Sequence, residues 1–216
     1  MKPVIIAGGS PELSKAHLIR LVESYPGAEV IGVDRGAACA AACGIRMSRA
    51  LGDFDSVTHM EKLQITQFAE IVEGHPPEKN RTDLELALDS AKGDPLIVTG
   101  AGGGRLDHTL SAVFLLEAAP EQTMIEEEHY SAQLLRPGTH KLYSRGHRYV
   151  SLIPLNHSAK EVTTTGLQYP LQREALFRSR SLSISNEWAG NGVAEVSFTE
   201  GLLIFIESDD AGYGQK

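Results

Sequence analysis

The chain has 216 residues with 20 basic and 28 acidic side chains, and its net charge of −8 argues against binding along a nucleic-acid backbone. Its 42% hydrophobic and 22% charged residues are typical of a globular protein and exclude a disordered tail and a coiled coil. No apolar run approaches the roughly 18 residues of a membrane span, and the N-terminal apolar stretch is too short for a signal peptide, so we expect a soluble, cytoplasmic protein.

Short apolar runs alternate with segments of helical periodicity in the first half of the chain. The expected strands are residues 3–7, 28–33, 47–51 and 96–99, and the expected helices are residues 12–24, 37–43, 82–91 and 106–119. Glycine-containing turns separate several of these segments. Strand, turn and helix repeated in this order predict an α/β domain with a mainly parallel sheet.

The second half consists of short β-rich runs separated by turn residues. These runs are residues 139–144, 149–154, 161–165, 181–185, 194–198 and 202–207. Their regular spacing predicts an antiparallel sandwich or barrel. We place the domain boundary near Pro137, which gives domains of residues 1–137 and 138–216, and the whole negative excess falls in the first of them.

Aspartates follow two of the expected strands. Asp34 ends the second strand, and Asp53 and Asp55 belong to the segment Gly-Asp-Phe-Asp-Ser after the third. If the chain stays extended through Phe54, both carboxylates of this segment project to the same side, because side chains alternate along a strand. Converging carboxylates repel unless a cation compensates them, and Mg²⁺ is the natural partner. The alternative interpretation is an aspartate-rich turn without a ligand.

A second group of polar residues opens the helix that we expect at 82–91. Lys79 and the N-terminal end of this helix favour an anion, and Asp83 can add a third carboxylate to a metal cluster. An ordinary capped helix start explains the same residues, with Thr82 or Asp83 near the N-cap.

A glycine-rich turn with a basic residue follows the strand at 96–99. Four glycines between residues 100 and 104, Gly103 among them, let backbone N–H groups approach a ligand, and Arg105 suits phosphate oxygens. The segment is neither a P-loop nor a dinucleotide fingerprint, and a glycine-rich connection without a ligand is the alternative. Carboxylates for a metal, together with cations and glycines for phosphates, predict a magnesium–nucleotide site.

In order and spacing these segments resemble the thiamine pyrophosphokinase (thiamine diphosphokinase) family over nearly the whole chain. The matching segments are Asp34 with its neighbours, residues 52–56, 79–83 and 102–108, and in the second half residues 166–171 and 183–187. One departure is visible, because Asn80 stands where the family usually has an acid.

The resemblance implies a homodimer with sites near the subunit interface, each subunit having an N-terminal α/β domain that binds ATP and Mg²⁺ and a C-terminal β-sandwich that binds thiamine. It implies transfer of the pyrophosphoryl group of ATP to the hydroxyethyl oxygen of thiamine, leaving AMP. In this chemistry the metal ligands would be Asp53, Asp55 and Asp83, and the residues at ATP would be Asp34, Lys79, Thr82, Gly103 and Arg105. Asp107 is our candidate for orienting or deprotonating the hydroxyl, with Asp34 or Asp55 as alternatives, and Arg105 would assist at the phosphates.

Thiamine is a cation with two flat rings, so it requires an aromatic face and polar groups that recognise its aminopyrimidine. Ser185 and Asn186 match the family segment, and Tyr169 and Trp188 are candidate stacking surfaces. Packing in a core or an interface is the alternative for Trp188, which is the single tryptophan of the chain.

Two other functions compete with the kinase. Asp53 and Asp55 also fit the Asp-x-Asp pattern of haloacid-dehalogenase-like phosphohydrolases, in which the first aspartate is a nucleophile. The second competitor is a non-catalytic module that binds a nucleotide or thiamine.

Overall fold

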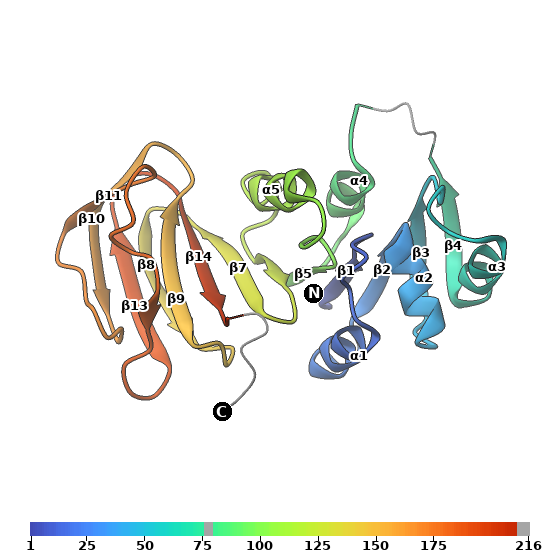
Figure 1. Cartoon of the computed structure of the whole chain (residues 1–216), viewed down its shortest axis with the longest axis horizontal. Helices are drawn as coiled ribbons and strands as arrows, with labels where there is room; N and C mark the ends of the chain where they lie inside the picture. The colour runs from blue at the N-terminus through green and yellow to red at the C-terminus, as the bar shows by residue number, and fades with distance from the viewer. Residues whose placement is uncertain (76–79, 211–216) are drawn as a thin grey trace. The chain divides into compact units, whose positions relative to one another are not determined.

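The computed structural model describes residues 1–75 and 80–210 (Figure 1). Its contacts divide the chain into two compact units, Met1–Glu128 and His129–Lys216. Strand β7 (Tyr130–Leu135) precedes Pro137, where we drew the boundary from the sequence, and it pairs along its whole length with β14 (Leu203–Ser208) of the second unit.

In the described part of the N-terminal unit, six strands form a sheet in the order β6-β5-β1-β2-β3-β4. They are β1 (Val4–Ala7), β2 (Glu29–Val33), β3 (Met47–Gly52), β4 (Ala69–Gly74), β5 (Leu96–Thr99) and β6 (Thr123–Glu126). Every neighbouring pair is parallel, which confirms the predicted sheet type. The strand order reverses between β1 and β5, and in such sheets ligands bind beyond the carboxyl ends of the strands at this switch point.

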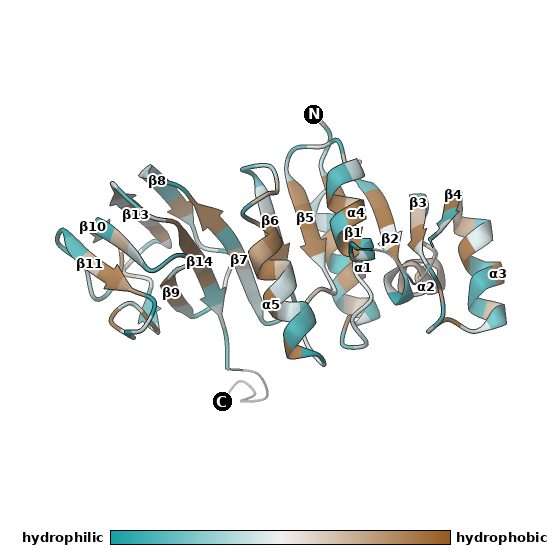
Figure 2. Cartoon of the chain, turned by 90° about the horizontal axis from the view of Figure 1, so that it is seen from above, coloured by the Kyte–Doolittle hydropathy of each residue, from teal (hydrophilic) through white to brown (hydrophobic). Residues whose placement is uncertain are grey.

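Helices cover both faces of this sheet. They are α1 (Lys15–Ser24), α2 (Arg35–Ala42), α3 (His59–Phe68), α4 (Asp83–Ser90) and α5 (Leu106–Leu115). Figures 1 and 2 show α4 and α5 on one face and α1, α2 and α3 on the other, as right-handed crossovers require when the chain reverses direction at β5. Strands β1 and β5 are buried at every residue because both faces are covered.

The C-terminal unit is an antiparallel β-sandwich. Its two sheets have the orders β12-β9-β14-β7 and β11-β10-β13-β8. The remaining strands are β8 (Gly138–Tyr143), β9 (Tyr149–Pro154), β10 (Ser158–Thr165), β11 (Glu174–Phe177), β12 (Asn186–Glu187) and β13 (Val193–Phe198). Buried side chains of both sheets, such as Leu152 and Val196, share one hydrophobic core, which confirms the predicted sandwich.

One predicted strand is wrong. Residues 181–185 form turns rather than a strand, with Ser185 in the left-handed region at a φ of 58°. The Ser183 hydroxyl donates a hydrogen bond to the Leu152 carbonyl oxygen at 2.5 Å, and the Ser183 carbonyl accepts the Leu152 N–H at 2.9 Å, so a turn is fastened to β9 there. Over the described ranges, no helix has both the length and the apolar character to cross a membrane.

Candidate active site

The carboxyl edge of the N-terminal sheet is built from glycines at the switch point. The Gly8 N–H donates to the Thr99 carbonyl at 2.7 Å, and the Ser10 N–H donates to the Gly100 carbonyl at 2.9 Å. A Cβ on Gly8 would lie 2.6 Å from the Gly100 oxygen, so only glycine allows the turns after β1 and β5 to approach this closely.

The N–H groups of the glycine-rich turn are directed at a carboxylate of the same unit. Gly100, Ala101 and Gly102 donate to the Glu127 carboxylate at 3.0, 2.9 and 2.9 Å. Successive backbone N–H groups form an anion-binding nest, and here the anion is a glutamate. Burial raises the pKa of Glu127, and the three hydrogen bonds oppose this rise. We had expected these N–H groups to face a ligand; the structure instead pairs them with Glu127, which our sequence analysis missed.

The next part of the turn is held by a second glutamate. Gly104 donates its N–H to Glu12 at 2.8 Å. A Cβ on Gly103 would lie 2.0 Å from a Glu12 oxygen, and the φ of Gly103 is +85°, so this position requires glycine. Gly103 therefore shapes the turn through backbone conformation and close approach.

Arg105 and Asp107, both proposed from the sequence, lie together at the start of α5 and are exposed. Arg105 Nε donates to Asp107 Oδ1 at 3.1 Å, and the guanidinium also pairs with Oδ2. The Arg105 guanidinium lowers the pKa of Asp107 to about 2. Asp107 is therefore ionised in this arrangement and can accept a hydrogen bond from a hydroxyl.

Asp34 lies against the end of the neighbouring strand β3. Its N–H donates to the Leu51 carbonyl at 2.9 Å. A Cβ on Gly52 would lie 1.9 Å from Asp34 Oδ1, so the Asp34 carboxylate occupies the space beside the first residue of the 52–56 segment. Asp34 has a φ of 48°, and this strained conformation directs the chain into α2.

The segment after β3 is an aspartate turn. Asp53 Oδ1 accepts a hydrogen bond from the Asp55 N–H at 3.0 Å. Phe54 between them is buried and left-handed, with a φ of 54°. The expectation of an extended chain that aims both carboxylates to one side is therefore wrong, because a left-handed residue interrupts the alternation.

The third predicted metal ligand lies at the start of α4. Thr82 is the N-cap, its Oγ accepting the Glu85 N–H at 3.2 Å, and Asp83 lies in the first turn. Lys79 lies outside the described residues. Within residues 1–75 and 80–210, no group of three His, Cys, Asp or Glu side chains is arranged to hold a metal. The structure thus does not bring Asp53, Asp55 and Asp83 together as one three-carboxylate cluster.

Two of the proposed thiamine-binding residues are paired in the C-terminal unit. Asn186 Oδ1 accepts the Tyr169 N–H at 3.0 Å, and Asn186 Nδ2 donates to the Tyr169 carbonyl at 2.8 Å. Both ends of the amide thus hold the Tyr169 backbone, while the Tyr169 residue is 66% exposed. Ser185 is fixed by a hydrogen bond from its N–H to Ser151 Oγ at 3.1 Å.

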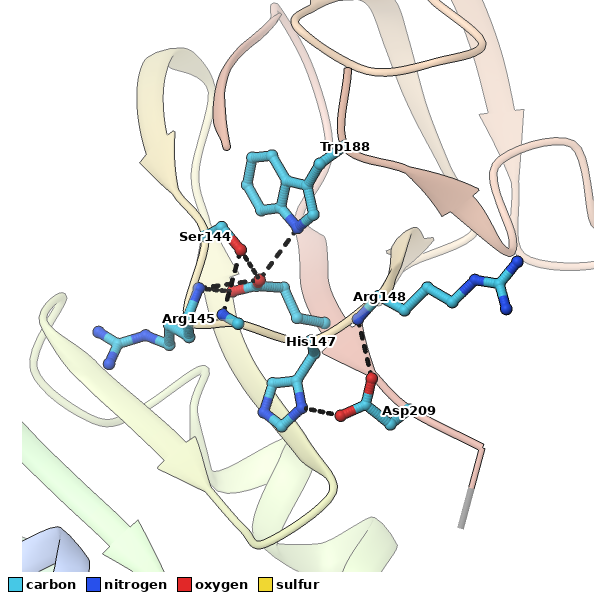
Figure 3. A network of polar contacts seen from close by, with 8 residues as sticks. Ser144, Arg145, His147, Arg148, Trp188 and Asp209 are labelled. Atoms are coloured by element: carbon cyan, nitrogen blue, oxygen red, sulfur yellow. Dashed lines mark hydrogen bonds and ion pairs between the residues drawn. The ribbon is translucent and has the colours of Figure 1, made fainter. Parts of the chain in front are cut away.

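Trp188 belongs to a polar network that our sequence analysis did not foresee (Figure 3). Its indole Nε1 donates to Glu207 at 3.1 Å, and its ring meets Phe205 edge-on with centroids 6.2 Å apart. An isolated antiparallel β-bridge also joins Trp188 to Leu167, two residues before Tyr169. The structure thus places Tyr169, Asn186 and Trp188 in one region of the sandwich.

Comparisons with known proteins assign a separate match to each half of the chain. Residues 27–126 match a family model described as "Thiamin pyrophosphokinase, catalytic domain". Residues 139–203 match a model described as "Thiamin pyrophosphokinase, vitamin B1 binding domain". Glu127 and Glu207 both lie outside the matched ranges.

Full-length relatives agree with these matches. The chain is 34% identical over 220 residues to a protein named thiamine pyrophosphokinase from Bacillus subtilis, covering 97% of this chain and 100% of the relative. A crystal structure of thiamine pyrophosphokinase from Bacillus subtilis superimposes with a TM-score of 0.84 at 30% identity, covering 97% and 100% of the two chains. A structure from Geobacillus thermodenitrificans gives a TM-score of 0.83 at 33% identity, covering 98% and 99%.

Proposed function

The chain belongs to the thiamin pyrophosphokinase family, and we propose that it transfers the pyrophosphoryl group of ATP to the hydroxyethyl oxygen of thiamine, giving thiamine diphosphate and AMP. The observation that carries the proposal is the match of two functional domains in order along one chain, at 34% identity to a full-length relative. The phosphohydrolase and the non-catalytic module gain no support from these matches.

We place ATP at the carboxyl edge of the N-terminal sheet, where the strand order reverses. Asp34, Thr82, Gly103 and Arg105 belong to this edge or to the helices that start there, and Lys79 precedes Thr82 in the sequence. Because Glu127 and Glu12 accept the N–H groups of residues 100–102 and 104, phosphate contacts fall mainly to the side chains of Arg105 and Lys79. Arg105 would exchange Asp107 for phosphate oxygens when ATP binds.

The carboxylate chemistry at this edge fits Mg²⁺. Asp34, Asp53 and Asp55 lie in adjoining turns, and a magnesium site needs only one or two protein carboxylates when substrate phosphates complete the shell. One or two of the predicted ligands Asp53, Asp55 and Asp83 would hold the ion together with the phosphates, and the ion when bound neutralises charge on the triphosphate. Asp107, Asp55 and Arg105 would act at the reacting groups, with Asp107 accepting a hydrogen bond that orients the thiamine hydroxyl.

We place thiamine on the C-terminal sandwich, with Tyr169 and Trp188 as aromatic surfaces and Ser185 and Asn186 as polar contacts. The match to the vitamin B1 binding domain spans all four residues. We further propose a cytoplasmic homodimer with the sites near the subunit interface. The apolar side chains of Leu106, Leu110 and Phe114, spaced four residues apart on α5 and exposed, are surface that a subunit interface would cover, which supports this proposal.

A coupled assay of AMP release tests the function. We expect AMP to form only when thiamine and Mg–ATP are both present, and Asp53→Asn and Asp83→Asn to lower kcat/KM by about 100-fold or more. Glu70→Gln, which changes an exposed carboxylate on β4, is the matched control and should retain wild-type turnover. Phosphate release from simple phosphoesters without thiamine, or full activity of both aspartate variants, would contradict the proposal.

A further inference from the structure

Glu207 is a fully buried carboxylate that no step of the proposed reaction uses. Its exposed fraction is 0%, whereas the other polar side chains buried among the described residues of this unit are the hydroxyls of Ser131, Ser151, Thr164 and Ser183. Burial raises the pKa of Glu207, and hydrogen bonds from the donors around it oppose this rise. A buried carboxylate is costly unless donors surround it, so the geometry of those donors indicates what this residue does.

The donors to Glu207 come from a loop and from a tryptophan. The Arg145 N–H donates to its two oxygens at 3.0 and 3.2 Å, and Ser144 Oγ donates at 3.3 Å. Trp188 Nε1 donates to Oε1 at 3.1 Å. Figure 3 shows hydrogen bonds from Ser144, Arg145 and Trp188 meeting at one unlabelled carboxylate, which these distances identify as Glu207.

Trp188 is held at two points of its ring. The hydrogen bond to Glu207 fixes the edge that carries Nε1, and Phe205 meets the ring at an interplanar angle of 70°. An indole has only two side-chain torsions, so one hydrogen bond and one aromatic contact suffice to set its orientation. The residue remains partly exposed, which leaves surface for a ligand.

Asp209, two residues further along the chain, provides a comparison. Its carboxylate accepts a hydrogen bond from the Arg148 N–H at 2.9 Å and pairs with His147 Nδ1 at 2.8 Å. Both carboxylates therefore fasten the loop 144–148 (Figure 3), but of these two only Glu207 is bonded to Trp188. A role in holding the loop is shared, whereas a role in orienting the tryptophan belongs to Glu207.

We propose that Glu207 is the positioning residue that orients Trp188 for thiamine, an inference that rests on the proposed function. The bond directs the indole N–H into the sandwich, so that the ligand meets an aromatic face of fixed orientation. A cationic ring stacks best on a face that is already in place, because no side-chain freedom is then lost on binding.

The single tryptophan makes this role measurable without catalysis. In the full-length protein without ligand, Glu207→Gln should shift the emission of the single tryptophan. The carboxamide has one acceptor oxygen and places an N–H group against donors such as the indole N–H of Trp188, so the surroundings of the indole change. Asp209→Asn is the matched control and should leave the emission unchanged. Calorimetric titration with thiamine should give a dissociation constant raised about tenfold in Glu207→Gln and less than twofold in Asp209→Asn.

A double-mutant cycle separates positioning from general destabilisation. In a Trp188→Phe background the indole N–H is absent, so Glu207→Gln should add little to the loss of thiamine affinity. The KM for thiamine should rise in Glu207→Gln while the KM for ATP stays within twofold of wild type. If Glu207→Gln does not fold, Glu207→Asp, which keeps the charge but shortens the side chain, replaces it in each measurement.

The outcomes are distinguishable from failure of the proposed function. Wild-type protein that makes no AMP with thiamine would contradict the function, and unchanged tryptophan emission in Glu207→Gln would overturn the positioning role whatever the reaction is. Wild-type turnover with equal thiamine affinity in Glu207→Gln, or full additivity with Trp188→Phe, would overturn the positioning role alone.

Discussion

Each unit of the chain contains a carboxylate that organises a loop, but the two carboxylates bind different kinds of donor. In the N-terminal unit, Glu127 accepts three consecutive backbone N–H groups of the glycine-rich turn. In the C-terminal unit, Glu207 accepts one backbone N–H, one hydroxyl and the indole of Trp188. The first arrangement sets a backbone conformation, and the second sets the orientation of a particular side chain.

This difference indicates how each region tolerates change. The proposed ATP-binding edge depends on positive φ angles and on glycines without a Cβ, at residues such as Gly52, Gly100 and Gly103. The proposed thiamine region depends on polar side chains that meet across the sandwich. Replacing one of these glycines should therefore damage the N-terminal edge most, and a conservative change of a polar side chain should alter the C-terminal region most.

Gly52→Ala should give the largest effect. The new Cβ would lie 1.9 Å from Asp34 Oδ1, at a φ of +147° that L side chains rarely adopt. We expect the free energy of unfolding to fall by about 2 kcal/mol or more, from backbone strain and overpacking, and turnover to fall as Asp34 moves. Urea unfolding followed by circular dichroism and the AMP assay measure the two effects.

Gly74→Ala is the control for this substitution. Gly74 is paired with Gly52 in the β3–β4 register, yet a Cβ at Gly74 would meet nothing within 4 Å. It should leave both stability and turnover close to wild type. Equal losses in the two variants would show that the edge does not depend on the space beside Asp34.

Glu127→Gln should have the next largest effect. The carboxamide keeps one acceptor oxygen and places an N–H group against backbone donors, so part of the nest loses its partner. We expect a loss of about 1–3 kcal/mol in the free energy of unfolding and a raised KM for ATP. Glu121→Gln, at an exposed position before β6, should change neither quantity. An unchanged KM for ATP with an intact fold would separate this turn from the nucleotide site.

The strands that were predicted correctly are those whose residues show a clear local pattern. The apolar runs at 96–99 and 149–154 coincide with β5 and β9, because a buried strand requires such a run. The exposed edge strand β4 and the mostly exposed helix α3 carry weak patterns, and we did not predict them. The run at 181–185 has strand-forming alternation, but it folds into turns, in which Ser183 bonds to Leu152 of β9 through its hydroxyl and its carbonyl and the Ser185 N–H bonds to the Ser151 hydroxyl.

The place of several candidate residues at the sheet edge could be predicted from the sequence, but their contacts could not, and their roles stay a prediction. Asp34, Arg105 and Asp107 lie at the carboxyl edge because parallel strands end at one edge, which spacing alone reveals. Phe54 is buried and left-handed, and the residue types of the segment 52–56 disclose neither property. Glu127 and Glu207 bond to residues 19 or more positions away, and in a single sequence no spacing rule connects such partners.

Asp209→Asn should have the smallest effect and a distinctive dependence on pH. The hydrogen bond from His147 and then that from the Arg148 N–H lower the pKa of Asp209 below its ordinary value of 3.8. A lowered pKa in the fold means that ionised Asp209 adds stability above the unfolded-state pKa, and that this stability is lost as the pH falls through the folded-state pKa. Because the side chain is exposed, the contribution is a few tenths of a kcal/mol, about the size of surface ion pairs.

Urea unfolding of wild type and Asp209→Asn at several pH values measures this contribution. Wild type should be the more stable protein at pH values above about 4, and the difference should vanish as the pH falls below the lowered pKa of Asp209. Asparagine keeps one acceptor oxygen, so the part of the difference that depends on pH reports the charge alone. If the difference in the free energy of unfolding between the two proteins stays constant down to the lowest pH, Asp209 fastens the loop 144–148 through hydrogen-bond geometry and not through its charge. Glu207 would then be the carboxylate whose charge matters for this loop.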